Sequence, residues 1–281
     1  MVKGVQQIPV RHIQEPELSG SFSIRDLEKL LDGKDMLQEL HRHDFFLIIA
    51  LKSGSGQHDI DFKAYTIADH IIFFMRPGQL HKLVLKAGST GYILQFSGDF
   101  YPSAAELLRR AGQQNHYQLS ETVSVKLQHV LASIFEEHRD KQERFKEVIQ
   151  ANMSIFFTRL IRQLPPSSAT AETRYRQERL DKFMTLLEQH ILTQKQVSQY
   201  ADMLNISTYQ LNAITKELLG KTTSTLINEQ IILEAKRCLL ATSYQVNQIA
   251  YHMGYEDPSY FIRFFKKQTG YSPDAFRHNS G

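Results

Sequence analysis

The chain has 281 residues, 42% of them hydrophobic, so its length and composition predict two domains with modest cores. Its net charge of +3 lies in the C-terminal part: residues 1–173 hold 20 Lys and Arg against 20 Asp and Glu, and residues 174–281 hold 13 against 10. The single cysteine, Cys238, excludes an internal disulfide and any multi-cysteine metal site. Without a visible signal peptide, a long apolar run or a Gly-rich phosphate loop, we expect a soluble cytoplasmic protein that does not span a membrane or hydrolyse nucleotides.

Short apolar, β-branched and aromatic runs fill residues 43–101 and are separated by turn signals such as Ser-Gly-Ser-Gly and Arg-Pro-Gly. Regular strand spacing of this kind predicts a β-sandwich or barrel. The expected strands are 45–51, 60–67, 71–75, 80–85 and 91–96.

Two segments of this region, His-Arg-His at 41–43 and Pro-Gly-Gln-Leu-His at 77–81, resemble the two motif regions of a cupin barrel. In metal-binding cupins a Glu joins these histidines, but here the corresponding position falls in an apolar run. We therefore expect no metal and no cofactor, and a three-histidine site stays open as the alternative. A barrel interior can enclose a small ligand. The candidate pocket residues are Arg42, His43, Arg76, His81 and Tyr92.

Two amphipathic helices are expected at 122–137 and 144–164, each packing on the barrel or forming a dimer contact. Residues 165–173, Pro-Pro-Ser-Ser-Ala-Thr-Ala-Glu-Thr, have the composition of a linker. The sequence thus predicts a first domain at 1–164 and a second at 174–281, which begins with a helix at 174–191.

A helix-turn-helix pattern covers residues 197–220, with Ala201 as the small residue between the helices, Asn205 at the turn and Ser207 as the helix cap. An uninterrupted helical pattern follows at 225–241. A helix of this size spans roughly 25 Å. It could therefore hold two DNA-binding helices about one turn of DNA, roughly 34 Å, apart.

A second copy of the pattern lies at residues 245–277. Gly254 suits the turn, and Asp257 with Pro258 suits the start of the next helix. On that helix three aromatic residues form an inward stripe: Phe261, Phe264 and Phe265. The faces that could meet DNA carry Ser259, Ile262, Arg263 and Lys266.

The paired motifs, with Ile-Ala-x-x-x-Gly-Tyr at 249–255 and Thr-Gly-Tyr-Ser-Pro-x-x-Phe-Arg at 269–277, resemble the AraC/XylS transcription regulators. The resemblance covers the last hundred or so residues and implies two recognition helices in adjacent major grooves. The implied DNA contacts are Tyr209, Gln210, Asn212 and Lys216 in the first motif, and Ser259, Arg263 and Lys266 in the second.

The first motif departs from the family pattern, because Thr208, Ala213 and Thr215 replace a Pro, a basic residue and a Phe. Its role stays open between base reading, for which Tyr209 and Asn212 are available, and a mainly structural part.

Together these patterns predict a multidomain α+β protein: an N-terminal cupin-like barrel with two packed helices, and an all-α domain with two helix-turn-helix motifs joined by one helix. We expect a sequence-specific transcription regulator and not an enzyme. Its partners would be promoter DNA, a small-molecule effector, a second copy of the chain and, by family resemblance, RNA polymerase. The alternatives are a cupin metal enzyme with a DNA-binding appendage and a dimeric DNA binder without a ligand.

Overall fold

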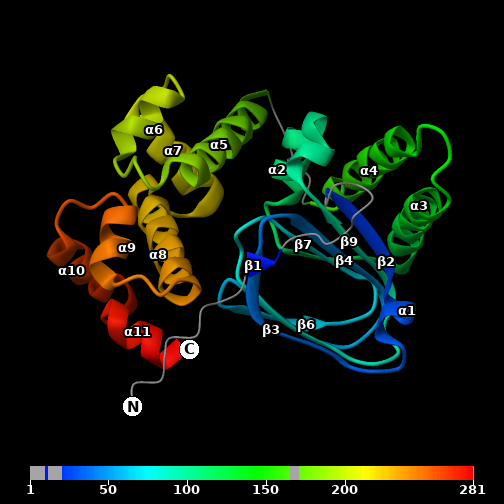
Figure 1. The fold of residues 1–281 in the computed structure, drawn as a ribbon. Coiled ribbons are helices and arrows are strands. Elements are labelled where there is room, and N and C mark those ends of the chain that lie inside the picture. Colours follow the sequence, from blue (N-terminus) through cyan, green and yellow to red (C-terminus); the bar gives the residue numbers. More distant parts are fainter. Residues whose placement is uncertain (1–9, 12–20, 165–170, 281) are drawn as a thin grey trace, which may run out of the picture. The chain divides into compact units, whose positions relative to one another are not determined.

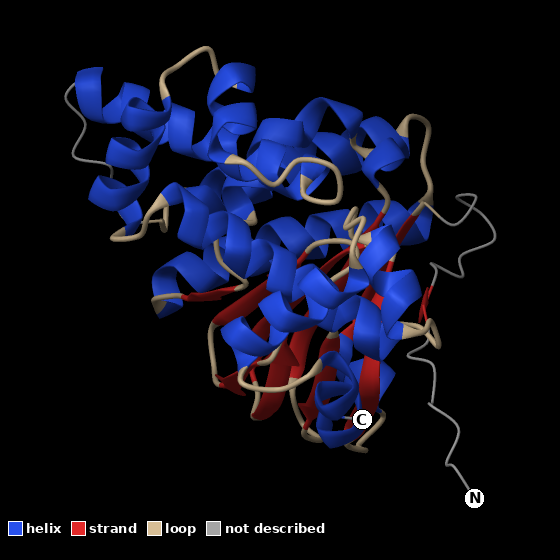
Figure 2. Cartoon of the chain, turned by 90° about the vertical axis from the view of Figure 1, so that its left-hand side faces the viewer, coloured by secondary structure: helices blue, strands red, loops and turns tan. Residues whose placement is uncertain are grey.

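The computed structural model describes residues 10–11, 21–164 and 171–280, which divide into two compact units near residue 166. The strands are gathered in the N-terminal unit, and the described residues of the C-terminal unit form helices (Figure 2). The expected multidomain α+β class is confirmed. None of the helices within the described residues is long and apolar enough to cross a membrane.

The N-terminal unit contains two five-stranded sheets that face each other as a barrel (Figure 1). The strand order is β1-β3-β8-β5-β6 in one sheet and β10-β7-β4-β9-β2 in the other. All neighbouring strands pair antiparallel except β1 and β3. The strands are β1 Val10–Arg11, β2 Phe22–Asp26, β3 Met36–His43, β4 Phe46–Ser53, β5 Gly56–Ile60, β6 Lys63–Ile67, β7 Ile71–Met75, β8 His81–Leu85, β9 Thr90–Phe96 and β10 His116–Gln118.

The second sheet is buried on both faces, which explains its continuous apolar runs. On β7, Phe73 belongs to the core between the sheets, whereas its neighbour Phe74 packs against Phe157 of a covering helix. The helices of this unit are α1 Leu27–Leu31, α2 Ala105–Ala111, α3 Glu121–Asp140 and α4 Phe145–Ile161. The two helices expected from the sequence are thus confirmed as α3 and α4, and α2 was not predicted.

The expected single strand at 60–67 is wrong: the segment belongs to a hairpin of β5 and β6. Its two-residue loop, Asp61 and Phe62, has positive φ angles of 46° and 70°. Such a loop fits the right-handed twist of the paired strands. Asp61 is a residue type that favours such loops, but Phe62 stands where Gly usually follows, so the sequence signal for the turn was incomplete.

The C-terminal unit consists of α5 Ala171–His190, α6 Val197–Met203, α7 Thr208–Leu219, α8 Thr223–Ala241, α9 Val246–His252, α10 Pro258–Thr269 and α11 Pro273–Ser280. Helix α5 begins at Ala171, so the last three residues of the expected linker 165–173 are helical. The remaining linker residues, 165–170, lie outside the described part of the chain. The linker was overestimated because Ala-Glu-Thr resembles the preceding polar segment in composition and yet suits a first helical turn.

Helices α6 and α7 form one helix-turn-helix motif, and α9 and α10 form the other. The same backbone bond closes both turns: Ile206 N–H donates to the Ala201 carbonyl at 3.1 Å, and Tyr255 N–H donates to the Ala250 carbonyl at 2.9 Å. Both alanines are buried, as close helix packing requires.

The turns of the two motifs depend on a left-handed residue, Asn205 in the first and Gly254 in the second. Gly254 has a further constraint, because a Cβ there would lie 2.2 Å from the Leu192 carbonyl oxygen. The expected caps are confirmed: the Ser207 side chain accepts a bond from Gln210 N–H, and that of Asp257 accepts one from Ser259 N–H.

Candidate functional site

Helix α10 presents a polar face with three of the predicted DNA contacts. Ser259, Arg263 and Lys266 are exposed, whereas Phe261 and Phe265 on the opposite face are fully buried. The Arg263 side chain is 70% exposed and lies 3.7 Å from the carboxylate of Asp257. An exposed pair of this kind contributes little to stability. The guanidinium therefore remains available to a nucleic acid.

Two other residues of α10 differ from expectation. Phe264 is only partly buried, although it contacts the core of the unit. Ile262, which was expected on a face that could meet DNA, is also half-buried and packs against that core. The face of α10 that packs against the core is wider than the three phenylalanines predict, because Ile262 and Phe264 contact the core from the two sides of this face.

Helix α7 gives its predicted contacts different surroundings. Tyr209 is 83% exposed, and Lys216 is exposed in the last turn. Gln210 is exposed too, but its Oε1 accepts a bond from Ser207 N–H at 2.9 Å and completes the helix cap.

Among the predicted contacts of α7, Asn212 has the most constrained surroundings. It is half-buried, and its Oδ1 accepts a hydrogen bond from Thr223 N–H at 3.2 Å, at the start of α8. The side chain therefore joins two helices, and this bond holds its acceptor oxygen toward α8. Reading adenine would need that oxygen as well as the amide group. The bond to Thr223 favours a supporting role for Asn212 in the motif.

The two recognition helices can be compared position by position from their first residues, Thr208 and Pro258. Ser259 then corresponds to Tyr209, Lys266 to Lys216 and Arg263 to Ala213. At the centre of the exposed face the second motif thus offers a cation that the first lacks, and α10 also carries Lys267 where α7 has Glu217.

Helix α8 connects the two motifs within one unit (Figure 1). Its 19 residues correspond to a length of about 28 Å. Successive major grooves on one side of DNA are roughly 34 Å apart. Because α8 packs against helices of both motifs, the spacing between them is set by a buried element and not by a loop.

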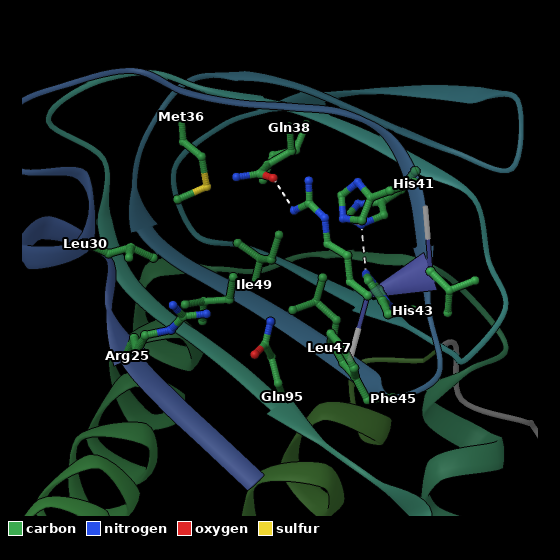
Figure 3. Close-up of a pocket in the computed structure, with 15 residues that line it drawn as sticks. Arg25, Leu30, Met36, Gln38, His41, His43, Phe45, Leu47, Ile49 and Gln95 are labelled. Carbon is green, nitrogen blue, oxygen red and sulfur yellow. Dashed lines mark hydrogen bonds between the residues drawn. The ribbon is translucent and has the colours of Figure 1, made fainter. Parts of the chain in front are cut away.

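The barrel encloses a cavity of about 600 Å³. One side of this pocket carries His41 and His43, and Arg25 lies on the other side (Figure 3). The lining residues are Val10, Arg11, Arg25, Leu30, Met36, Gln38, His41, His43, Phe45, Leu47, Ile49, His81, Leu83, Ile93 and Gln95. No carboxylate occurs in this set of described residues.

Of the predicted pocket residues, His43 and His81 line the cavity, and Arg42, Arg76 and Tyr92 do not. Strand alternation explains two of these errors. Arg42 lies between two inward histidines and points the other way. Tyr92 faces α3, where its ring centroid lies 5.7 Å from that of Phe135.

Arg76 lies outside the pocket for a different reason. It follows the last residue of β7, and its side chain runs beside Gly112 at the end of α2, where a Cβ would lie 2.9 Å from the Arg76 Cδ. The residue therefore lies under the covering helices and not in the barrel interior.

A bulge in β3 brings polar residues to the pocket. The pairing with β8 shifts between Gln38 and His41, so Gln38 and the two histidines of 41–43 all point inward. Gln38 also accepts a hydrogen bond from Arg11. No strand was expected before residue 45, and the sequence does not show this bulge, so Gln38 was not among the predicted pocket residues.

Four histidine side chains meet at the His41 end of the barrel. The Nε2 of His81 lies 2.9 Å from that of His41 and 2.8 Å from that of His43, and its Nδ1 lies 2.9 Å from Nε2 of His58. All four are buried. His58 was not predicted; its alternation with Ile60 in one strand was the available signal.

Burial keeps these imidazoles neutral. Burial, with a smaller contribution from the neighbouring histidines, lowers the pKa of His43 to about 4 and that of His58 to about 3. The pKa values of His41 and His81 are also lowered, mainly by burial. At neutral pH the cluster thus presents nitrogen lone pairs to its surroundings.

Two family models match the chain in the same order as its two units. Residues 33–150 match the AraC-like ligand binding domain, and residues 200–279 match a helix-turn-helix domain. The chain is therefore a DNA-binding transcription regulator. It belongs to the AraC/XylS family, as the resemblance of its motifs predicts.

The curated relatives span nearly the whole chain. The HTH-type transcriptional activator RhaS of Escherichia coli O157:H7 (strain EC4115 / EHEC) is 25% identical over 272 residues, which cover 92% of this chain and 93% of RhaS. RhaS of Klebsiella pneumoniae (strain 342) is 24% identical and covers 84% of this chain and 86% of its own length.

Among solved structures, unsaturated fatty acid bound ToxT from Vibrio cholerae strain SCE256 matches with a TM-score of 0.43 and 16% identity, over 92% of this chain and 95% of ToxT. The DNA-binding domain of AdpA in complex with a target DNA matches with a TM-score of 0.34 and 25% identity, over 36% of this chain and 90% of that one.

Proposed function

We propose that the chain controls transcription in the cytoplasm by gripping promoter DNA with both motifs of its C-terminal unit, in response to a small molecule in the barrel. The observation that carries this proposal is the pair of matching turns joined by the buried helix α8. The domains proposed for the two tasks are residues 1–164 and 171–281, joined by 165–170.

The proposed contacts on α10 are Ser259, Arg263 and Lys266, with Arg263 as the residue that reaches a base edge. On α7 they are Tyr209 and Lys216, with Gln210 as a cap residue that also faces outward. The second motif supplies more of the electrostatic attraction to phosphate, because its centre carries Arg263 where the first motif carries Ala213.

The pocket favours an effector that combines an acidic group with an apolar part. Arg11 and Arg25 contribute two cations to the lining. Leu30, Met36 and Ile49 contribute apolar surface to the same cavity. An anion would therefore be attracted electrostatically while its hydrocarbon part is buried.

The partners proposed for this function are a second copy of the chain and RNA polymerase. Exposed apolar side chains on α3 and α4, namely Val125, Val148 and Ile155, support a dimer contact through these helices. The relatives are called activators, and activation is accordingly the proposed sign of regulation.

Selection of bound sequences from random DNA, followed by footprinting, tests the proposal. We expect a footprint with two successive major-groove contacts per chain. A footprint of one groove would remove one motif from DNA binding, and the absence of any selected sequence would refute the proposal.

A thermal-shift comparison tests the effector. An apolar carboxylic acid should raise the melting temperature more than the amide of the same acid, and Arg25→Gln should remove the difference. If no acid shifts the melting temperature in the wild-type protein, the ligand-independent dimeric DNA binder becomes the better description.

A further inference from the structure

The four-histidine cluster has a hydrogen-bonding conflict that the regulator function does not explain. Nδ1 of His41 lies 2.7 Å from the Glu39 carbonyl oxygen, and a carbonyl can only accept. Nδ1 of His41 therefore carries the hydrogen, and Nε2 of the neutral ring has a lone pair. That lone pair points at Nε2 of His81, 2.9 Å away.

Without an ion, His81 can serve both neighbours only through one shared hydrogen. If its Nε2 carries a hydrogen, that hydrogen is divided between the Nε2 lone pairs of His41 and His43, at 2.9 and 2.8 Å. If its Nε2 carries a lone pair, two lone pairs meet between His41 and His81. A buried polar contact left in this state is costly.

A cation between the three Nε2 atoms removes the conflict. Each ring then directs a lone pair at the ion and keeps its hydrogen on Nδ1. For His41 that hydrogen goes to the Glu39 carbonyl, and for His81 it goes to Nε2 of His58, 2.9 Å away. Metal-bound histidines usually donate their other N–H to an acceptor in this way.

The distances suit a transition metal. Imidazole nitrogens bind such ions at roughly 2.0–2.1 Å. Nitrogens 2.8 and 2.9 Å apart then subtend an angle of about 90° at the ion, which is typical of five- or six-coordinate geometry. His41, His43 and His81 also offer ligand atoms that all lie within 4.8 Å of one another.

We propose that His41, His43 and His81 bind one divalent first-row transition-metal ion at the end of the barrel pocket, and that His58 is the outer partner that orients His81. This departs from the sequence-based expectation of no metal. The acidic ligand of metal-binding cupins is absent, but His58, which was not predicted, supplies a buried hydrogen-bond acceptor for His81.

The three imidazole ligands determine which metal ions the site can bind. Three imidazoles suit Zn²⁺, Co²⁺, Ni²⁺ or Cu²⁺, whereas Mg²⁺ and Ca²⁺ prefer oxygen ligands. The three ligand histidines also line the cavity, so the remaining coordination positions face it. An acidic effector could then bind the ion directly.

The positive charge of Arg11 disfavours binding of the metal ion when no anion is bound beside it. Its guanidinium is close enough to help lower the pKa values of His41, His43 and His81. The same charge repels a dication and attracts an anion. The metal ion and Arg11 would then both attract a negatively charged ligand in the cavity.

Metal titration of the full-length protein, stripped with a chelator, tests this site. We expect one equivalent of Co²⁺ or Zn²⁺ per chain to bind far more tightly than Mg²⁺. The visible spectrum of bound Co²⁺ should show the weak bands of a five- or six-coordinate ion. His43→Gln and His81→Gln should each weaken binding by at least about 100-fold, and His58→Gln by about 10- to 100-fold.

Two variants act as controls. His129 is an exposed histidine of α3, away from the pocket lining, so His129→Gln should leave binding unchanged. Arg11→Gln should tighten binding of the bare ion several-fold, because it removes a repulsive charge. Circular dichroism checks the fold of each variant. The Co²⁺ spectrum is measured on the wild-type protein, so this part of the test does not depend on the folding of any variant.

The site is refuted if wild-type protein binds Co²⁺ no more tightly than Mg²⁺, or if His129→Gln weakens binding as much as His43→Gln. The titration contains no DNA, so its outcome is independent of the DNA selection that tests the proposed function.

Discussion

The two helix-turn-helix motifs share a backbone plan and differ at their surfaces. In both, a buried alanine carbonyl accepts the bond that closes the turn, and a left-handed residue follows the first helix. The second motif has Arg263 at the centre of its exposed face, where the first has Ala213. The comparison teaches that the turn chemistry maintains the fold of each motif, while DNA contact depends on a few exposed positions that can vary separately.

The largest effect should come from the turn of the second motif. Gly254→Ala places a Cβ 2.2 Å from the Leu192 carbonyl oxygen and requires a φ of 74° from alanine. We expect a loss of about 2–4 kcal/mol in the free energy of unfolding. Urea denaturation measures it.

Asn205→Gly in the first motif is the matched control, since glycine accepts the same left-handed conformation. It should change the free energy of unfolding by less than about 1 kcal/mol. Equal losses in the two variants would contradict the special constraint on Gly254.

The next effect concerns DNA affinity. Arg263→Ala should weaken specific binding by about 1–3 kcal/mol and relax the preference at one base pair, because a guanidinium can bond two acceptors of guanine. A titration of selected and single-mismatch DNA measures both. Unchanged affinity and unchanged preference would remove Arg263 from base reading.

A smaller effect tests whether Asn212 supports the fold of the first motif or contacts DNA. Asn212→Ala removes the acceptor of Thr223 N–H and should cost about 1 kcal/mol of unfolding free energy, with the sequence preference unchanged. Asn212→Asp keeps an acceptor there and should retain the stability. A changed preference at one base pair in Asn212→Ala would restore this residue to the reading surface.

The smallest effect would make the motifs more alike. Ala213→Arg places a cation where the second motif has Arg263, and Ala213 is exposed, so the fold should be unaffected. If the first motif meets DNA, the slope of log affinity against log salt concentration should become steeper by about 1. An unchanged slope would indicate that α7 stays away from phosphate.

The helical unit was predicted well because its signals are local. Gly254, the Asp257 and Pro258 pair and the small Ala250 each act within a few residues, and the structure places them as expected. Asn212 shows the limit of local signals. Its exposure depends on Thr223, which belongs to the next helix, and periodicity within one helix cannot reveal such a contact.

The barrel pocket was predicted poorly because its side chains are sorted by register. Tyr92 and Ile93 are neighbours in sequence, yet one faces a helix and the other faces the cavity. A shift of one residue exchanges the two faces of a strand. The bulge after Gln38 adds such a shift within β3 itself.

Periodicity, caps and turn residues were thus sufficient to establish two domains, a barrel followed by a double helix-turn-helix, and the class of protein. The folded structure was needed to bring His58 and His81 together and to turn Arg42 and Tyr92 away from the pocket. It was also needed to form the hydrogen bond between Asn212 and Thr223. The physical reason is range: helix and turn preferences act between near neighbours, whereas the alignment of paired strands and packed helices joins residues that the sequence places far apart.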